Sequence, residues 1–254
     1  RVELFYGEAI EVFNYLIKDL DIISVFSYQE SGTQGSWERD KKIKQFCKSN
    51  QINWEESQRD GILRGIKNRK DWNKKWHLKM HKSIIQNKYT VSKETRLEHP
   101  FLMPSILESQ LKEYPNNYQP PGEKNAWRYL KSFANQRGFN YQRHISKPME
   151  SRMSCSRLSP YLAWGNMSIK QAFQFIGTHP NGTRNNKAFS AMLTRLHWHC
   201  HFIQKFEMEC RYETECINSG YEILPHEKNE AFIKAWKTGT TGYPLVDACM
   251  RAVE

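Results

Sequence analysis

The chain has 254 residues, of which 39% are hydrophobic and 13% aromatic, which is enough for one large domain or two smaller ones with sizeable cores. This composition excludes a disordered chain, and no apolar run approaches the roughly 20 residues that a membrane-spanning helix needs. Lys and Arg outnumber Asp and Glu by 38 to 27, giving a formal charge of +11. The charge favours a polyanionic partner such as DNA or RNA, although an anionic membrane surface or no partner fits equally.

The cysteines and the chain ends indicate where the protein works and how much of it is present. Six cysteines stand at irregular spacings without a CxxC pair, a pattern typical of reduced thiols in an intracellular protein. The chain starts at Arg1 without a signal peptide and stops at Glu254 within a helical pattern. We therefore expect an internal fragment, truncated at both ends.

The first part of the chain alternates strand and helix patterns. We predict strands at 2–5, 22–28 and 52–54, where short runs are rich in β-branched and aromatic residues. Apolar residues at helical spacing predict helices at 8–20 and 37–49. Strand, helix and strand in this order predict a parallel sheet covered by helices.

A basic stretch with interleaved tryptophans begins near Arg64 and predicts one amphipathic helix through Lys82. Its Trp and Lys side chains could grip a nucleic-acid backbone. A solvated lysine face with the aromatic residues packed inward explains the same pattern and is the favoured interpretation. Five prolines between Pro100 and Pro121 then predict an extended connector and a domain boundary.

Helical patterns dominate the sequence after Gly122. They predict an all-α second part with helices at 123–137, 168–179, 185–211, 229–237 and 243–253.

Three stretches of the second part contain candidate functional residues. Small hydroxyl and thiol residues at 154–159 precede a helix and could hold phosphate oxygens, although alone they indicate only a helix cap. His197 and His201 share a helix face and could begin a zinc site, but a polar helix face near a pocket is the favoured interpretation and we expect no metal. The stretch 236–251 predicts a tight helix entry at Tyr243 and Pro244.

In this order, the three stretches resemble the DNA photolyase and cryptochrome family. The resemblance rests on Cys155-Ser156-Arg157-Leu158-Ser159-Pro160-Tyr161-Leu162, on Trp198 within its helix, and on Trp236 to Arg251 with its Thr-Gly-Tyr-Pro and Val-Asp-Ala elements. Residues 30–54 are similar to the end of the family's α/β antenna domain. The resemblance implies a truncated Rossmann-like α/β domain with a basic helix at 1–99, an interdomain connector at 100–121 and the first half of a helical FAD-binding domain at 122–254.

The family's site residues are carried over position by position. The resemblance implies that the FAD diphosphate lies against Cys155, Ser156, Arg157, Leu158 and Ser159, with Tyr141 lining the same site. Cys155 stands where many members have Thr, which removes one hydroxyl. Trp198 matches the Trp that faces damaged bases, while His199 replaces the usual Arg and Arg195 replaces an acidic residue. These differences indicate a divergent subgroup, another lesion, or signalling instead of repair.

The resemblance also implies what the complete protein does. Photoexcited reduced FAD would pass an electron to a cyclobutane pyrimidine dimer in UV-damaged DNA, making the protein a monomeric, cytoplasmic deoxyribodipyrimidine photo-lyase. The alternatives are a cryptochrome-type blue-light photoreceptor and a metal-dependent nucleic-acid enzyme that uses His197, His201 and cysteines. A second, antenna chromophore could lie near Gln29 and Glu30. Most residues that touch the flavin ring in the family lie beyond Glu254, so we expect the chain alone to bind FAD poorly and to be inactive.

Overall fold

The computed structural model describes residues 3–86, 97–113, 118–184 and 186–253. Residue contacts divide the chain into two compact units, Arg1–Cys210 and Arg211–Glu254, and each is described by itself. No helix within the described ranges is long and apolar enough to cross a membrane. The structure is mostly helical with one small parallel sheet. The predicted division at 1–99, 100–121 and 122–254 stays a prediction.

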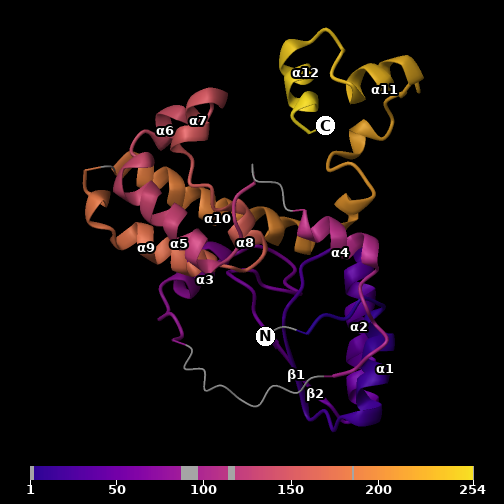
Figure 1. The fold of residues 1–254 in the computed structure, drawn as a ribbon. Coiled ribbons are helices and arrows are strands. Elements are labelled where there is room, and N and C mark those ends of the chain that lie inside the picture. Colours follow the sequence, from indigo (N-terminus) through magenta and orange to yellow (C-terminus); the bar gives the residue numbers. More distant parts are fainter. Residues whose placement is uncertain (1–2, 87–96, 114–117, 185, 254) are drawn as a thin grey trace. The chain divides into compact units, whose positions relative to one another are not determined.

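The sheet and its two helices form the first part of unit 1 (Figure 1). Its elements are α1 Ala9–Asp19, β1 Ser24–Tyr28, α2 Gln34–Ser49 and β2 Asn53–Ser57. The two strands pair in parallel, with Ser24 opposite Asn53 and Tyr28 opposite Ser57. The predicted helices and the strands at 22–28 and 52–54 are therefore confirmed, with shifts of one to three residues at most ends.

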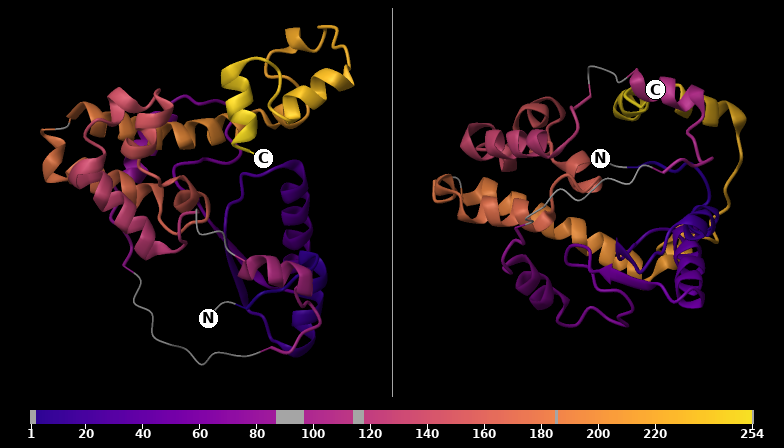
Figure 2. Two further views of the ribbon diagram at one scale, coloured as in Figure 1. Left: turned by 45° about the horizontal axis from the view of Figure 1, so that its top comes forward. Right: turned by 60° about the horizontal axis from the view of Figure 1, so that its bottom comes forward.

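A small apolar core lies on one face of this sheet. Ile43, Phe46 and Cys47 of α2 are buried together with Ile52, and α1 packs against the same cluster beside α2 (Figure 2). Phe26 and Tyr28 point to the opposite face and are 72% and 71% exposed, as the alternation of side chains along a strand requires. The described sheet therefore buries one face only.

The predicted strand at 2–5 is wrong for its described residues, since Glu3, Leu4 and Phe5 have no strand conformation. Instead, the Phe5 ring packs against His99, with centroids 4.3 Å apart, and the Tyr6 amide donates to the carbonyl of Phe101 at 3.0 Å. The apolar run is thus used for side-chain packing and not for a β ladder. Val2 lies outside the described residues.

The basic stretch after Arg64 contains a shorter helix than predicted. Helix α3 spans Trp72–Met80, and it begins late because Gly65 and Asp71 adopt left-handed φ angles of 71° and 60°. Trp72 and Trp76 are 2% and 1% exposed. The tryptophans therefore belong to the core, as the favoured interpretation states.

The loop before α3 is tied to the rest of the unit. Gln204 is fully buried; its amide nitrogen donates to the carbonyl of Leu63 at 2.9 Å, and its amide oxygen accepts from the Leu63 N–H at 2.7 Å. Gly61 lies directly against Trp76, where a Cβ atom would sit 2.1 Å from the indole. Only glycine fits at that position.

The predicted extended connector is wrong at its centre, where α4 spans Ser105–Lys112. Pro104 stands just before the helix, a position at which its missing N–H costs nothing. Ile106, Leu107 and Leu111 recur at helical spacing between the prolines. Residues 114–117 of the connector lie outside the described residues.

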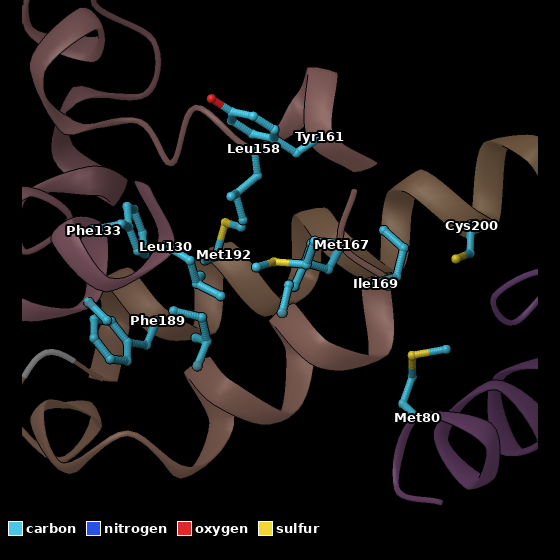
Figure 3. Packing of buried hydrophobic residues seen from close by; sticks show 14 of the residues in the cluster. Met80, Leu130, Phe133, Leu158, Tyr161, Met167, Ile169, Phe189, Met192 and Cys200 are labelled. Atoms are coloured by element: carbon cyan, nitrogen blue, oxygen red, sulfur yellow. The ribbon is translucent and has the colours of Figure 1, made fainter. Parts of the chain in front are cut away.

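The helical part of unit 1 surrounds the larger core. Its elements are α5 Glu123–Ser132, the π-helix η1 Phe133–Arg137, α6 Tyr141–His144, α7 Pro148–Ser154, α8 Ser159–Ala163, α9 Ile169–Thr178, the 3-10 helix η2 Pro180–Gly182 and α10 Asn186–Met208. Buried side chains from α3, α5, α8, α9 and α10 meet in one cluster. Figure 3 shows Leu158 pointing from the loop before α8 towards Met192 of α10.

Unit 2 is small and is held largely by helix caps. It contains the 3-10 helix η4 Ser219–Tyr221 and helices α11 Glu230–Lys237 and α12 Pro244–Arg251; a further 3-10 helix, η3 Cys210–Glu213, spans the division. Asp247 accepts from the Thr241 amide at 2.8 Å and from the Gly242 amide at 3.0 Å. These bonds, with that from the Thr241 hydroxyl, lower the pKa of Asp247. The predicted tight helix entry is confirmed.

Candidate functional site

The loop between α7 and α8 carries the predicted phosphate-binding residues, and Arg137 holds its backbone. The Arg137 guanidinium donates to the carbonyls of Cys155 and, at 3.2 Å, of Ser156. It also donates to the carbonyl of Tyr129 at 3.0 Å and to the Ser132 hydroxyl at 3.1 Å. Burial lowers the pKa of Arg137. The loop is thus fixed through its carbonyl oxygens.

The opposite side of this loop offers hydrogen-bond donors. Within the described residues, the amide N–H groups of Ser156 and Arg157 have no acceptor, and the side chain of Ser159 is exposed at the start of α8. Leu158 anchors the loop in the core at 1% exposure, while the Cys155 amide donates to the carbonyl of Ser151. Amide and hydroxyl donors that converge at a turn fit phosphate oxygens.

Tyr141 and Arg195 connect this loop to α10. Tyr141 is 7% exposed, and its burial raises the pKa of the phenol. The charge of Arg195 acts in the opposite direction, and the Arg195 guanidinium carbon lies 4.5 Å from the centroid of the Trp198 ring, within the range of a cation–π contact. The chain therefore brings Tyr141, Arg195 and Trp198 together, although they come from α6 and α10.

Trp198 presents an aromatic surface to solvent. Its side chain is 42% exposed, and its ring meets Phe202, one turn further along α10, with centroids 6.3 Å apart. Arg195 next to it is also exposed. An exposed indole beside a cation is suited to stacking on a base near a phosphate.

His199 lies away from this surface and faces Asp60 in the loop before α3. Burial lowers the pKa of His199, and the charge of Asp60 acts in the opposite direction. Burial also raises the pKa of Asp60. The His199 ring nitrogen Nδ1 lies 4.0 Å from the buried Cys200 sulfur. His199 therefore contacts the interior, unlike Arg195 and Trp198.

His197 and His201 belong to a cluster of aromatic rings. His197 Nε2 lies 3.1 Å from Asn73 Oδ1, and the His197 ring is 5.0 Å from that of Trp72. His201 is hydrogen-bonded to the guanidinium of Arg69, a cation that opposes metal binding. Across the residues that the structure describes, no group of three His, Cys, Asp or Glu side chains could hold a metal ion.

Sequence reasoning missed Arg137 and Asp60. Arg137 stands at the end of the predicted helix 123–137 and resembles any basic residue near a helix C-terminus. Its role depends on the wider turn of η1. Asp60 lies far from α10 in the sequence, and no motif connects it with His199.

Comparison with known proteins gives the same assignment in sequence and in fold. Residues 192–254 match the family model described as the FAD binding domain of DNA photolyase. A deoxyribodipyrimidine photo-lyase of Alkalihalophilus pseudofirmus is 28% identical over 151 residues, covering 58% of this chain and 30% of the relative. Cryptochrome-2 of Arabidopsis thaliana is 30% identical over 139 residues, covering 52% of this chain and 22% of the relative.

The fold comparison extends over nearly the whole chain. The crystal structure of a bacterial class III photolyase from Agrobacterium tumefaciens superimposes with a TM-score of 0.71 at 19% identity. The match covers 97% of this chain and 54% of that one. The chain therefore spans about half the length of this solved structure, and the aligned parts span less than a third of the two curated relatives.

The helical part and the matched FAD-binding model define a flavoprotein whose cofactor is FAD. The sequence and fold comparisons support membership of the chain in the photolyase/cryptochrome family. The predictions of the family and of FAD as its cofactor are confirmed.

Proposed function

We propose that the protein containing this chain repairs cyclobutane pyrimidine dimers in UV-damaged DNA with light. The observation that carries the proposal is a series of interactions, in which the charge of Arg195 acts on Tyr141 and the Arg195 guanidinium lies over the Trp198 ring. It joins a predicted cofactor residue to the exposed aromatic surface that we assign to the lesion. Photo-lyases among the relatives support the reaction class.

The loop 155–159 would hold the FAD diphosphate. Arg137 fixes its carbonyls on one side, so the amides of Ser156 and Arg157 and the hydroxyl of Ser159 face an anion on the other. Tyr141 would close the site next to Arg195. Bound and reduced FAD supplies the electron that light drives to the dimer and accepts it again, so the ring opens without net oxidation.

Trp198 and Arg195 would bind the lesion outside the cofactor site. The indole offers a broad face for a dimer extruded from the duplex, which costs less to unstack than an intact pair. Arg195 is a donor at a position where many family members have an acidic residue, so it would bond carbonyl oxygens of the bases or a phosphate.

The second candidate is a cryptochrome-type photoreceptor. The orientation of His199 towards Asp60 favours it, because the position that carries Arg in many repair enzymes then offers no exposed cation here. A plant cryptochrome among the relatives is consistent with this candidate.

Blue-light illumination of the protein expressed from the complete gene tests both candidates. The protein is loaded with FAD, reduced, and mixed with an oligonucleotide that contains one defined thymine dimer. We expect loss of the dimer in the light and none in the dark. An unchanged dimer, despite bound and photoreducible flavin, would favour the photoreceptor.

A second chromophore in the α/β part remains a prediction. Gln29 follows β1 directly, and its amide donates to the carbonyl of Ser57 at 2.9 Å. Both strands of the described sheet end here, at the edge where ligands of open parallel sheets bind. A second absorption band that survives removal of FAD would support it. DNA as the partner, the monomeric state and the cytoplasmic location are likewise proposals.

A further inference from the structure

A basic hollow of about 480 Å³ lies beside the loop 155–159. It is lined by the connector at Tyr118, by Tyr129 of α5, and by Arg137, Arg152 and Arg157. All these residues belong to unit 1. Its volume falls within the range of about 300 to 1,000 Å³ typical of small-molecule sites.

Of the predicted cofactor residues, the hollow shares only Arg157. Cys155, Ser156, Leu158, Ser159 and Tyr141 do not line it. It adjoins Arg137, and therefore the carbonyl side of the loop, whereas the unpaired amides of the loop belong to the other side.

Arg157 lines the hollow, and its backbone has an unusual conformation. Its φ angle of 63° is in the left-handed region, an unusual conformation for a residue with a Cβ atom. Its Nη2 donates to the carbonyl of Arg152 at 2.8 Å, and its own carbonyl accepts from Gln119 at 2.8 Å. Arg157 therefore faces Arg152 and the connector.

The positive charge of the hollow favours an anionic ligand. Three arginines line it, and none of its described lining residues is acidic. Arg137 already directs its donors at the protein backbone and Ser132. Arg152 is exposed, and only its backbone carbonyl takes part in the bond to Arg157. Arg152 and Arg157 therefore retain guanidinium donors for a ligand, and guanidinium groups suit phosphate.

The remaining lining is aromatic and apolar. Tyr118 and Tyr129 contribute rings, and Met153 and Pro120 contribute apolar surface. The Tyr129 ring is held in place by Tyr161, with centroids 5.8 Å apart, and by the guanidinium of Arg137 at 6.0 Å. A fixed ring beside free guanidinium groups suits a flat base that carries a phosphate.

We propose that this hollow binds a phosphate-bearing nucleotide. Arg152 and Arg157 hold the phosphate, and the base lies against Tyr118 and Tyr129. The nucleotide is either free or one unit of a single DNA strand, since both present the same chemistry. The site does not depend on the proposed repair activity.

Titration calorimetry with thymidine 5′-diphosphate tests the proposal on the protein from the complete gene. Excess FAD is present throughout, so that the flavin site is occupied. We expect one thymidine diphosphate per chain and about tenfold weaker binding in Arg152→Gln and in Arg157→Gln. Arg143→Gln on α6 removes the same charge from an exposed position outside the hollow and should bind as the unaltered protein does.

Two further variants separate ligand contacts from folding. Arg157→Lys keeps the charge and should recover part of the affinity lost in Arg157→Gln, with an unchanged melting temperature in both. Tyr118→Leu should weaken thymidine diphosphate but leave inorganic pyrophosphate unaffected.

Three results would overturn the proposal. They are displacement of thymidine diphosphate by FAD, unchanged affinity in both arginine variants, and pyrophosphate binding as tightly as thymidine diphosphate. Pentathymidylate distinguishes the two sources of the nucleotide. Binding that shows the same arginine dependence identifies a DNA strand, while exclusion of the pentamer with retained thymidine diphosphate identifies a free nucleotide.

Discussion

The loop 155–159 and the α10 surface at Arg195 and Trp198 lie in the same unit but are built in opposite ways. The loop is fixed through its backbone, by a guanidinium and by a core leucine. The α10 surface consists of exposed side chains on a helix whose opposite face is buried in the larger core. Changes to Leu158 or Arg137, which fix the loop, should therefore alter stability, whereas a change to Trp198 should alter recognition alone.

The largest effect is expected from Leu158→Ala. Leu158 is 1% exposed within the larger core, so its truncation leaves a cavity and should cost about 2 to 5 kcal/mol of unfolding free energy. Chemical denaturation measures this loss. Met153→Ala, an apolar residue on α7 with 71% exposure, is the control and should change little. A loss below about 0.5 kcal/mol for Leu158→Ala would contradict the role of Leu158 as an anchor.

Arg137→Met is expected to have the second largest effect. The substitution keeps an apolar stem but leaves the carbonyls of Cys155 and Ser156 without their donor, which should cost about 2 to 3 kcal/mol. FAD affinity should fall as well, because the loop loses its fixed shape. Denaturation and flavin fluorescence measure the two losses, and Arg143→Met serves as the control. Unchanged values in both measurements would show that the loop does not need Arg137.

Trp198→Ala tests the exposed surface of α10. The protein should keep its stability within about 0.5 kcal/mol, because the side chain is 42% exposed. Discrimination between dimer-containing and intact DNA should fall about tenfold, as expected for the loss of one stacking surface. Competition binding measures the ratio. Trp236→Ala removes an indole of 51% exposure in unit 2 and should leave the ratio unchanged; full discrimination in Trp198→Ala would refute its assigned role.

The smallest effect concerns the histidines of α10. Burial lowers the pKa of His197, and nearby His77 and His201 lower it further. As the pH falls, His197 therefore takes up a proton in the unfolded chain before it does so in the folded one. Its contribution to stability is complete above about pH 6.5 and is lost as the pH falls through the lowered folded-state pKa. His197→Gln should melt with a weaker dependence on pH between about 7 and 5. His226→Gln in unit 2 should keep the original slope, and equal slopes in all three proteins would contradict the prediction.

Much of the fold could be predicted because its helices and strands carry clear periodicity. The helices α1, α2, α9 and α11 have one apolar face, and their predicted bounds agree closely with those of the structure. The errors fall where tertiary contacts override the pattern. Gly61 and Gln204 hold the residues before Trp72 in a loop, which hydropathy alone cannot indicate.

The candidate site was predictable only in part. The motif predicts the loop 155–159 and Trp198 as site residues, and in the structure the charge of Arg195 acts on Tyr141. The motif could not show that Arg157 differs in conformation from its neighbours in the loop. The left-handed φ angle of this residue has no sequence signal in an arginine. The charge interaction of Asp60 with His199 joins residues about 140 positions apart, and such pairs follow from packing alone.

The pairing of Gln204 with Leu63 has a consequence for motion. A loop without secondary structure would ordinarily open by itself, exposing its amides to exchange with solvent on a short timescale. Here both backbone groups of Leu63 are bound to a side chain of α10, so this part of the loop opens only when that contact with the helix breaks. Asp60 and His199 therefore belong to one cooperative unit, and local fraying of one without the other is suppressed.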